Sequence, residues 1–333
     1  MGSGKLKIIS FAVLVVLLIS VSALFGVYYY ANNVPSVSRD KVIDIPKGNG
    51  VKKISALLEE EGVIKNGNLF AVYVIVQGWQ DRLKAGEYEF KKGSTMASVA
   101  LKLVWGDVLV HKVTVPEGLT VKETAALLDK DGVLDGKRFL AAAADPKLME
   151  SLPGRHLTGT EGYLFPDTYT YTKGVTPEKF IRMMVERFNK VYASLDGSKN
   201  RVNLTDSELI ILASIIEKET GNASERPLIS AVFHNRLKLG MRLESDPTVI
   251  YGLGEDFDGN LTKEDLNAMT QYNTYLVKGL PPGPICNPGK ESIIAAMSPA
   301  PVDYLYFVSR GNGTHYFSVN YKDHQRAVSE YQR

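Results

Sequence analysis

The sequence predicts an α+β protein with an apolar N-terminal helix, a small αβ module and a larger, mainly helical region. Three observations predict it: an uncharged apolar run at the start, a repeated strand–turn–helix pattern after it, and helical periodicity beyond Gly154. The expected boundaries are a short tail at 1–7, a membrane-spanning helix at 8–31, a linker at 32–40, the αβ module at 41–110 and the larger region at 111–333.

Composition narrows the class of protein. The 333 residues carry a formal net charge of +2, and this balance argues against nucleic acid as a partner, because such binders usually carry a clustered basic excess. The single Cys rules out a disulfide framework and every multi-Cys zinc site. The five His are scattered and contain no His-Glu-x-x-His pair, so a zinc protease is not expected.

The N-terminal apolar run predicts a membrane anchor. Ile8–Ala31 contains no charged residue and is long enough to cross a hydrocarbon core of ~30 Å. Lys5 and Lys7 precede the run, so the N-terminus should be cytoplasmic and the remainder exported. The alternative is a cleaved signal peptide, but the apolar stretch of such peptides is only ~7–15 residues long. An uncleaved anchor is therefore favoured.

A repeat follows the linker. Asp44–Gly48 and the helix pattern after it recur at Thr114–Gly118, seventy residues later. In each copy an alternating strand ends at a glycine turn, a helix follows, and Gly62 or Gly132 stands where that helix should end. The pattern resembles the LysM family of glycan-binding modules over residues 41–110, and a generic αβ unit without a ligand is the alternative.

The C-terminal part contains a predicted hairpin. Tyr304–Val308 and His315–Val319 have the β-branched and aromatic residues typical of strands, and Gly311–Gly313 supplies the turn between them. A polar helix is expected from Lys322 to the end.

One helix is a candidate for carrying chemistry. Thr205 and Glu208 form a capping-box pattern, and the following residues 209–216 are almost wholly apolar, which predicts a helix buried on all sides. Its C-terminal end presents Glu217, Lys218 and Glu219. The helix dipole and burial both raise the pKa of a carboxyl group at this place, and a general acid needs such a pKa.

Only one of the two glutamates can point into a given cleft, because positions two apart do not share a helix face. Glu217 follows the small residues Ala213 and Ser214 along its face, where they leave room for a substrate. This favours Glu217 as the acid and Glu219 as a structural, ion-paired residue. The alternative is that both are exposed charges at a helix end.

Several polar and aromatic segments accompany this helix, in the combination typical of carbohydrate sites: EGYLFPDTY from Glu161, RLESDPT from Arg242 and YNTY from Tyr272. Together with LASIIEKET, ASERPLISAVFHNRL and YLYFVSRGNGTHYF, they resemble the YceG-like family of endolytic murein transglycosylases across the exported region. The resemblance implies an enzyme of the bacterial inner membrane that faces the periplasm. It implies cleavage of the MurNAc–GlcNAc β-1,4 bond within nascent glycan strands, leaving 1,6-anhydro-MurNAc ends, close to peptidoglycan synthases.

The resemblance places the catalytic Glu on Glu217. Candidate substrate-binding residues are Tyr163, Asp167, Ser245, Asp246, Tyr272 and Asn273. A transglycosylase can work with one carboxyl group, which acts first as acid and then as base for the C6 hydroxyl of the sugar. We therefore expect no metal and no organic cofactor.

Three other functions stay open. A muramidase would pair Glu217 with Asp167 or Asp246, because ordinary glycosidases use two carboxylates. A non-catalytic envelope anchor would bind glycan through its repeats alone. A transpeptidase would use Cys286 with His315, although the proline-rich loop around this Cys lacks a helix N-terminus that would lower its pKa.

Overall fold

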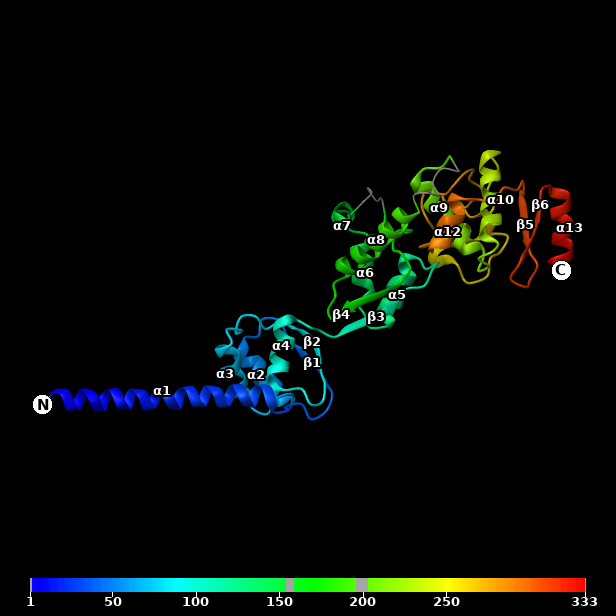
Figure 1. Ribbon diagram of the computed structural model, residues 1–333. Coiled ribbons are helices and arrows are strands. Elements are labelled where there is room, and N and C mark those ends of the chain that lie inside the picture. Colours follow the sequence, from blue (N-terminus) through cyan, green and yellow to red (C-terminus); the bar gives the residue numbers. More distant parts are fainter. Residues whose placement is uncertain (1, 154–158, 196–202, 333) are drawn as a thin grey trace. The chain divides into compact units, whose positions relative to one another are not determined.

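The computed structural model describes residues 2–153, 159–195 and 203–332 (Figure 1). The described residues form helices and three two-stranded sheets, which confirms the predicted α+β class. The chain divides into two compact units. Unit 1 comprises Met1–His111 with Thr170–Lys173, and unit 2 comprises Lys112–Tyr169 with Gly174–Arg333.

Unit 1 contains the strand and the helix that the repeat predicts, and a second helix, which was not predicted, follows before the next strand. Strands β1 and β2 pair antiparallel, with Ile43 opposite Tyr88, and the inward-facing side chains of both strands pack on the helices. Asn66 caps the second helix of the pair through its side chain, so a local polar residue sets where that helix begins. The elements are α1 Gly2–Asn33, β1 Lys41–Ile45, α2 Val51–Glu60, α3 Gly67–Val76, β2 Gly86–Phe90 and α4 Met96–Trp105.

Helix α1 is a single long helix whose first part extends beyond the rest of unit 1 (Figure 1). Its segment Lys7–Asn33 is long and apolar enough to cross a membrane. Large apolar side chains from Ile8 to Phe25 are exposed, whereas Ala31 is fully buried in the core of the unit. The helix therefore joins an uncovered apolar stretch directly to a folded module.

Unit 2 contains the second copy of the repeat and the helical region. Strands β3 Val110–Thr114 and β4 Thr168–Thr172 form the second two-stranded sheet. The remaining elements are α5 Val121–Lys130, α6 Gly136–Ala143, α7 Pro146–Ser151, α8 Pro177–Ser194, α9 Asp206–Glu219, α10 Arg226–Lys238, α11 Asp246–Leu253, the short 3-10 turns Gly254–Asp256 and Asp265–Asn267, α12 Lys290–Met297, β5 Tyr306–Ser309, β6 His315–Ser318 and α13 Tyr321–Tyr331.

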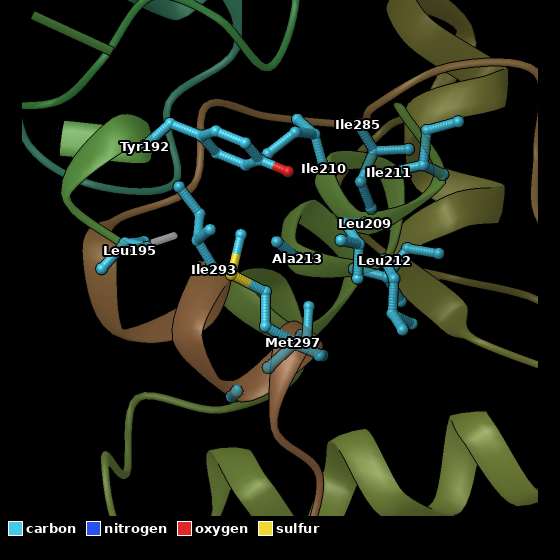
Figure 2. Close-up of a cluster of buried hydrophobic side chains, with 14 of the residues drawn as sticks. Tyr192, Leu195, Leu209, Ile210, Ile211, Leu212, Ala213, Ile285, Ile293 and Met297 are labelled. Carbon is cyan, nitrogen blue, oxygen red and sulfur yellow. The ribbon is translucent and has the colours of Figure 1, made fainter. Parts of the chain in front are cut away.

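Helix α9 lies in the core of unit 2. Thr205 and Glu208 form the predicted capping box, and every residue from Leu209 to Ile216 is buried, as the apolar run predicts. Figure 2 shows side chains of α9 packed together with Ile285, Ile293 and Met297 from later in the chain. Burial on all sides fixes the helix, and with it the carboxyl groups at its C-terminal end.

The predicted hairpin and terminal helix are also present. Strands β5 and β6 pair antiparallel with Phe307 opposite Phe317, and α13 packs against them. The turn chemistry at Gly311 and Gly313 fits, since both residues have positive φ.

Candidate active site

A cavity of about 540 Å³ lies beside the C-terminal end of α9. Segments distant in sequence build its wall: the end of α9, helix α10, the turn before α11, the β5–β6 hairpin and α13. Its polar and aromatic lining includes Glu219, Arg236, Glu244, Asp246, Tyr275, Phe307, His315, Tyr321 and His324. A volume of this size falls in the ordinary range for small-ligand sites.

Glu219 is the α9 carboxyl group that reaches this cavity. Helix α9 ends there because Thr220 adopts an extended conformation. The Glu219 carboxylate accepts a hydrogen bond from the Ser245 hydroxyl. Burial raises the pKa of Glu219 to about 7, the Ser245 hydrogen bond lowers it in part, and the charge of Asp246 raises it. A large fraction of this group is therefore protonated at neutral pH.

The turn before α11 holds the partners of Glu219. Glu244 has a positive φ of 52° there, which turns the chain into the start of α11. The Ser245 backbone N–H donates to Thr274 Oγ1 at 3.0 Å, and the Ser245 carbonyl accepts from Thr248 Oγ1 at 2.6 Å. These bonds aim the Ser245 hydroxyl at Glu219.

Asp246 and Tyr275 form a second polar pair in the cavity wall. The Tyr275 hydroxyl donates to Asp246 Oδ1 at 2.6 Å, and burial followed by this bond raises the pKa of Tyr275. Asp246 itself is exposed. Asp246 therefore brings a second carboxyl group to the cavity that Glu219 lines.

Glu217 has different surroundings. Its side chain is 6% exposed, its Oε2 accepts from the Gly289 N–H at 2.9 Å, and its Oε1 lies 3.4 Å from Arg226 Nη2. Glu117 Oε2 lies 3.8 Å from the same nitrogen. The Glu217 carboxyl group is therefore held by a guanidinium and a backbone N–H.

Two expectations about this helix end are wrong. The space expected beside Glu217 is filled, because Ala213 and Ser214 are fully buried and Ser214 Oγ accepts from the Ile285 N–H at 3.0 Å. The ion pair expected for Glu219 is replaced by the Ser245 hydrogen bond, and no salt bridge to it occurs among residues the structure describes. Glu219 has a raised pKa and lines the cavity, whereas Glu217 is not among the residues that line it.

The other predicted site residues divide between the cavity and the core. Asp246 lines the cavity, and Ser245 is buried next to it, where its hydroxyl donates to Glu219. Asp167 forms an ion pair with Arg187 and is absent from the cavity wall. Tyr163 is buried in the core, with its ring centroid 5.1 Å from that of Phe188.

Tyr272 and Asn273 belong to the loop that carries Tyr275, but neither lines the cavity. Tyr272 packs against Tyr251 at a ring distance of 4.8 Å. Asn273 is fully buried, and its amide donates to the carbonyls of Leu266 and Ala268 at 3.0 and 2.9 Å. Its amide therefore holds the loop in shape, and the contact of Asn273 with sugar stays a prediction.

Cys286 and His315 are not brought together as the transpeptidase alternative requires. Cys286 is fully buried, its thiol donates to the Ser214 carbonyl at 3.3 Å, and burial raises its pKa well above the usual range. His315 lines the cavity and pairs with Glu225 at 2.7 Å. A buried thiol with a raised pKa is a poor nucleophile.

The sequence reasoning missed several residues of the cavity, among them Tyr275, Arg236 and the Glu225 partner of His315. Each of these residues lies in a segment that the sequence analysis quotes as a motif, and that motif is the sequence signal that could have indicated it.

Glu161 is a further buried carboxyl group. Burial raises the pKa of Glu161 to about 7, and Glu161 accepts hydrogen bonds from the Val121 N–H and the Tyr251 hydroxyl. It lines a second cavity, of about 410 Å³, and not the cavity of Glu219. Within the described ranges, no group of three or more His, Cys, Asp or Glu is arranged to hold a metal ion.

Comparison with known proteins gives a consistent set of relatives. The YceG-like family profile matches residues 43–330. A Bacillus subtilis protein (strain 168) named endolytic murein transglycosylase is 33% identical over 305 residues, covering 87% of this chain and 84% of the relative. A Streptococcus pneumoniae protein of the same name (serotype 2, strain D39 / NCTC 7466) is 31% identical, covering 98% of this chain but only 65% of its own length. The crystal structure of a YceG-like protein from Listeria monocytogenes matches with a TM-score of 0.59 at 33% identity, covering 87% of this chain and 99% of that one.

Proposed function

The chain belongs to the YceG-like family, and from this we propose that it is a peptidoglycan lytic transglycosylase, a carbon–oxygen lyase acting on polysaccharide. The relatives' name, endolytic murein transglycosylase, supports the reaction class. The bond cleaved would be the β-1,4 bond between MurNAc and GlcNAc within a strand. The observation that carries the proposal is Glu219, a carboxyl group with a pKa of about 7 on the wall of a cavity large enough for sugar.

We infer that Glu219 is the general acid, in place of Glu217. The protonated carboxyl group gives its proton to the glycosidic oxygen as the C1–O4 bond breaks. The C6 hydroxyl of the same MurNAc attacks C1, the 1,6-anhydro ring closes, and the hydroxyl proton leaves to a base. No water is consumed, so the reaction needs one carboxyl group as the acid and one base for the hydroxyl proton.

Substrate contacts follow from the cavity wall. Asp246 can accept hydrogen bonds from sugar hydroxyls, and the Tyr275 and Tyr321 rings offer apolar faces to a pyranose. Ser245 acts on the substrate through Glu219, whose orientation and pKa it sets.

The proposed location is the bacterial inner membrane. Helix α1 would cross the bilayer once, with a cytoplasmic N-terminus and a periplasmic enzyme, because Lys5 and Lys7 precede the apolar run. The module at 41–110 would be LysM-like and contact glycan. In this location the enzyme would cut nascent strands close to peptidoglycan synthases and terminate their elongation.

A muramidase is the second candidate, because Asp246 lines the same cavity as Glu219 and offers a second carboxylate. Asp167 is not available for this role, since it forms an ion pair with Arg187. Hydrolysis adds a water to the product and transglycosylation does not, so product mass separates the two reactions.

The raised pKa of Glu219 predicts a pH dependence. A general acid works only while protonated, so kcat/KM for glycan cleavage should fall as pH rises through about 7. Ser245→Ala removes a hydrogen bond that lowers this pKa, so the fall should move to higher pH. The rate of muropeptide release would be measured between about pH 5 and pH 9. A rate that stays flat or rises across neutral pH would argue against Glu219 as the acid.

A further inference from the structure

His315 lies in the wall of the Glu219 cavity, and its imidazole pairs with Glu225, which is not part of the lining. His315 Nδ1 lies 2.7 Å from Glu225 Oε2, and the His315 backbone N–H donates to Glu225 Oε1 at 3.0 Å. The side chains are 12% and 10% exposed. One carboxylate thus holds both the backbone and the ring of His315, which fixes the direction of the ring.

This arrangement decides which ring nitrogen is available. A carboxylate only accepts hydrogen bonds, so Nδ1 carries the hydrogen and the neutral ring has its lone pair on Nε2. The ring is also packed against Phe307, perpendicular to it at 5.4 Å. No hydrogen bond to Nε2 comes from any residue in the described ranges. A fixed basic nitrogen is therefore free for a ligand in the cavity.

We propose that His315 is the catalytic base that accepts the C6 hydroxyl proton, with Glu225 as its positioning residue; this rests on the proposed transglycosylase function. Glu219 protonates O4 while the C1–O4 bond breaks. The C1–O6 bond forms as the O6 proton moves to His315 Nε2. The resulting imidazolium is stabilised by the Glu225 carboxylate, as carboxylate-backed histidines are in hydrolytic triads. A proton then returns from the imidazolium to Glu219 through solvent, and the enzyme is reset.

If His315 is the base, its loss changes the ratio of anhydro to reducing ends among the products; if it only binds sugar, its loss does not. Without the base, Glu219 still protonates the leaving oxygen, but the C6 hydroxyl attacks C1 more slowly. Water then competes for C1, and the products shift from anhydro ends towards reducing ends. A residue that only supports the fold or holds the sugar would lower the rate and leave the product ratio as it was.

The test uses the full-length chain with His315→Gln on purified peptidoglycan, and measures both total cleavage and the ratio of anhydro to reducing ends. Total cleavage is expected to fall about 10²-fold, with a lower anhydro share. Glu225→Gln should shift the ratio in the same direction by less, and it provides the test if His315→Gln does not fold. His111→Gln is the matched control, because His111 forms a similar pair with Glu87 at 2.6 Å in unit 1.

Either an unchanged rate or a lower rate with the wild-type product ratio would overturn the role of His315. A wild-type enzyme that makes no anhydro ends would instead overturn the proposed function itself. The wild-type digest therefore separates the two failures.

Discussion

Glu219→Gln should lower the rate of glycan cleavage by about 10³-fold, whereas Glu217→Gln should keep cleavage per folded molecule within a few-fold of wild type. The glutamine amide at 219 preserves the side-chain shape and can still accept the Ser245 hydrogen bond, but it cannot donate a proton to the glycosidic oxygen. The measurement is release of soluble muropeptides, with the folded fraction of each variant checked by circular dichroism.

The matched variant at Glu217 tests the choice between the two glutamates. Glu217→Gln removes the negative charge beside Arg226 and keeps an acceptor for the Gly289 N–H, so its main effect should be on stability. If Glu217→Gln abolished cleavage and Glu219→Gln spared it, the role implied by family resemblance would hold and the cavity would lose its proposed acid.

Arg236→Met should destabilise unit 2 by about 3–5 kcal/mol. Arg236 is 7% exposed and donates to the carbonyls of Leu305, Arg242 and Leu243 at 2.7, 3.1 and 2.9 Å. Methionine fills a similar volume but leaves these buried acceptors without a donor. Chemical denaturation followed by circular dichroism measures the loss in free energy of unfolding.

The control for this variant is Arg242→Met, at an exposed position, which should change the free energy of unfolding by less than about 0.5 kcal/mol. Equal effects at the two positions would mean that the hydrogen bonds of Arg236 do not hold the cavity wall. The same pair of variants would show whether activity follows the integrity of that wall.

The features that sequence predicts well in this chain are local ones. The capping box at Thr205 and Glu208 depends on residues three apart, and the β5–β6 hairpin depends on a short turn. The apolar run from Leu209 to Ile216 predicts burial without saying what covers it. Such signals need no knowledge of distant parts of the chain.

The choice of acid depends on distant parts. Helical periodicity correctly separates Glu217 from Glu219, but the cavity wall comes from α10, the turn at Ser245, the hairpin and α13. The sequence of α9 alone does not indicate which face of the helix the other elements leave uncovered beside the cavity. The same reason explains why Glu225 was not linked to His315, ninety residues away.

The roles of polar residues in loops are also difficult to predict from the sequence. Ser245 and Asn273 are both small polar residues in motif-rich loops, yet one reaches Glu219 and the other bonds the backbone of its own loop. A loop must satisfy its buried backbone groups, and side chains often serve that purpose. Composition alone does not separate these uses.

The most direct test of the account is the mass of the products that the purified enzyme releases from peptidoglycan. We expect muropeptides that are one water lighter than hydrolysis products, made by wild type and by Glu217→Gln and lost in Glu219→Gln. Release of reducing-end products alone, or anhydro products undiminished in Glu219→Gln, would contradict it.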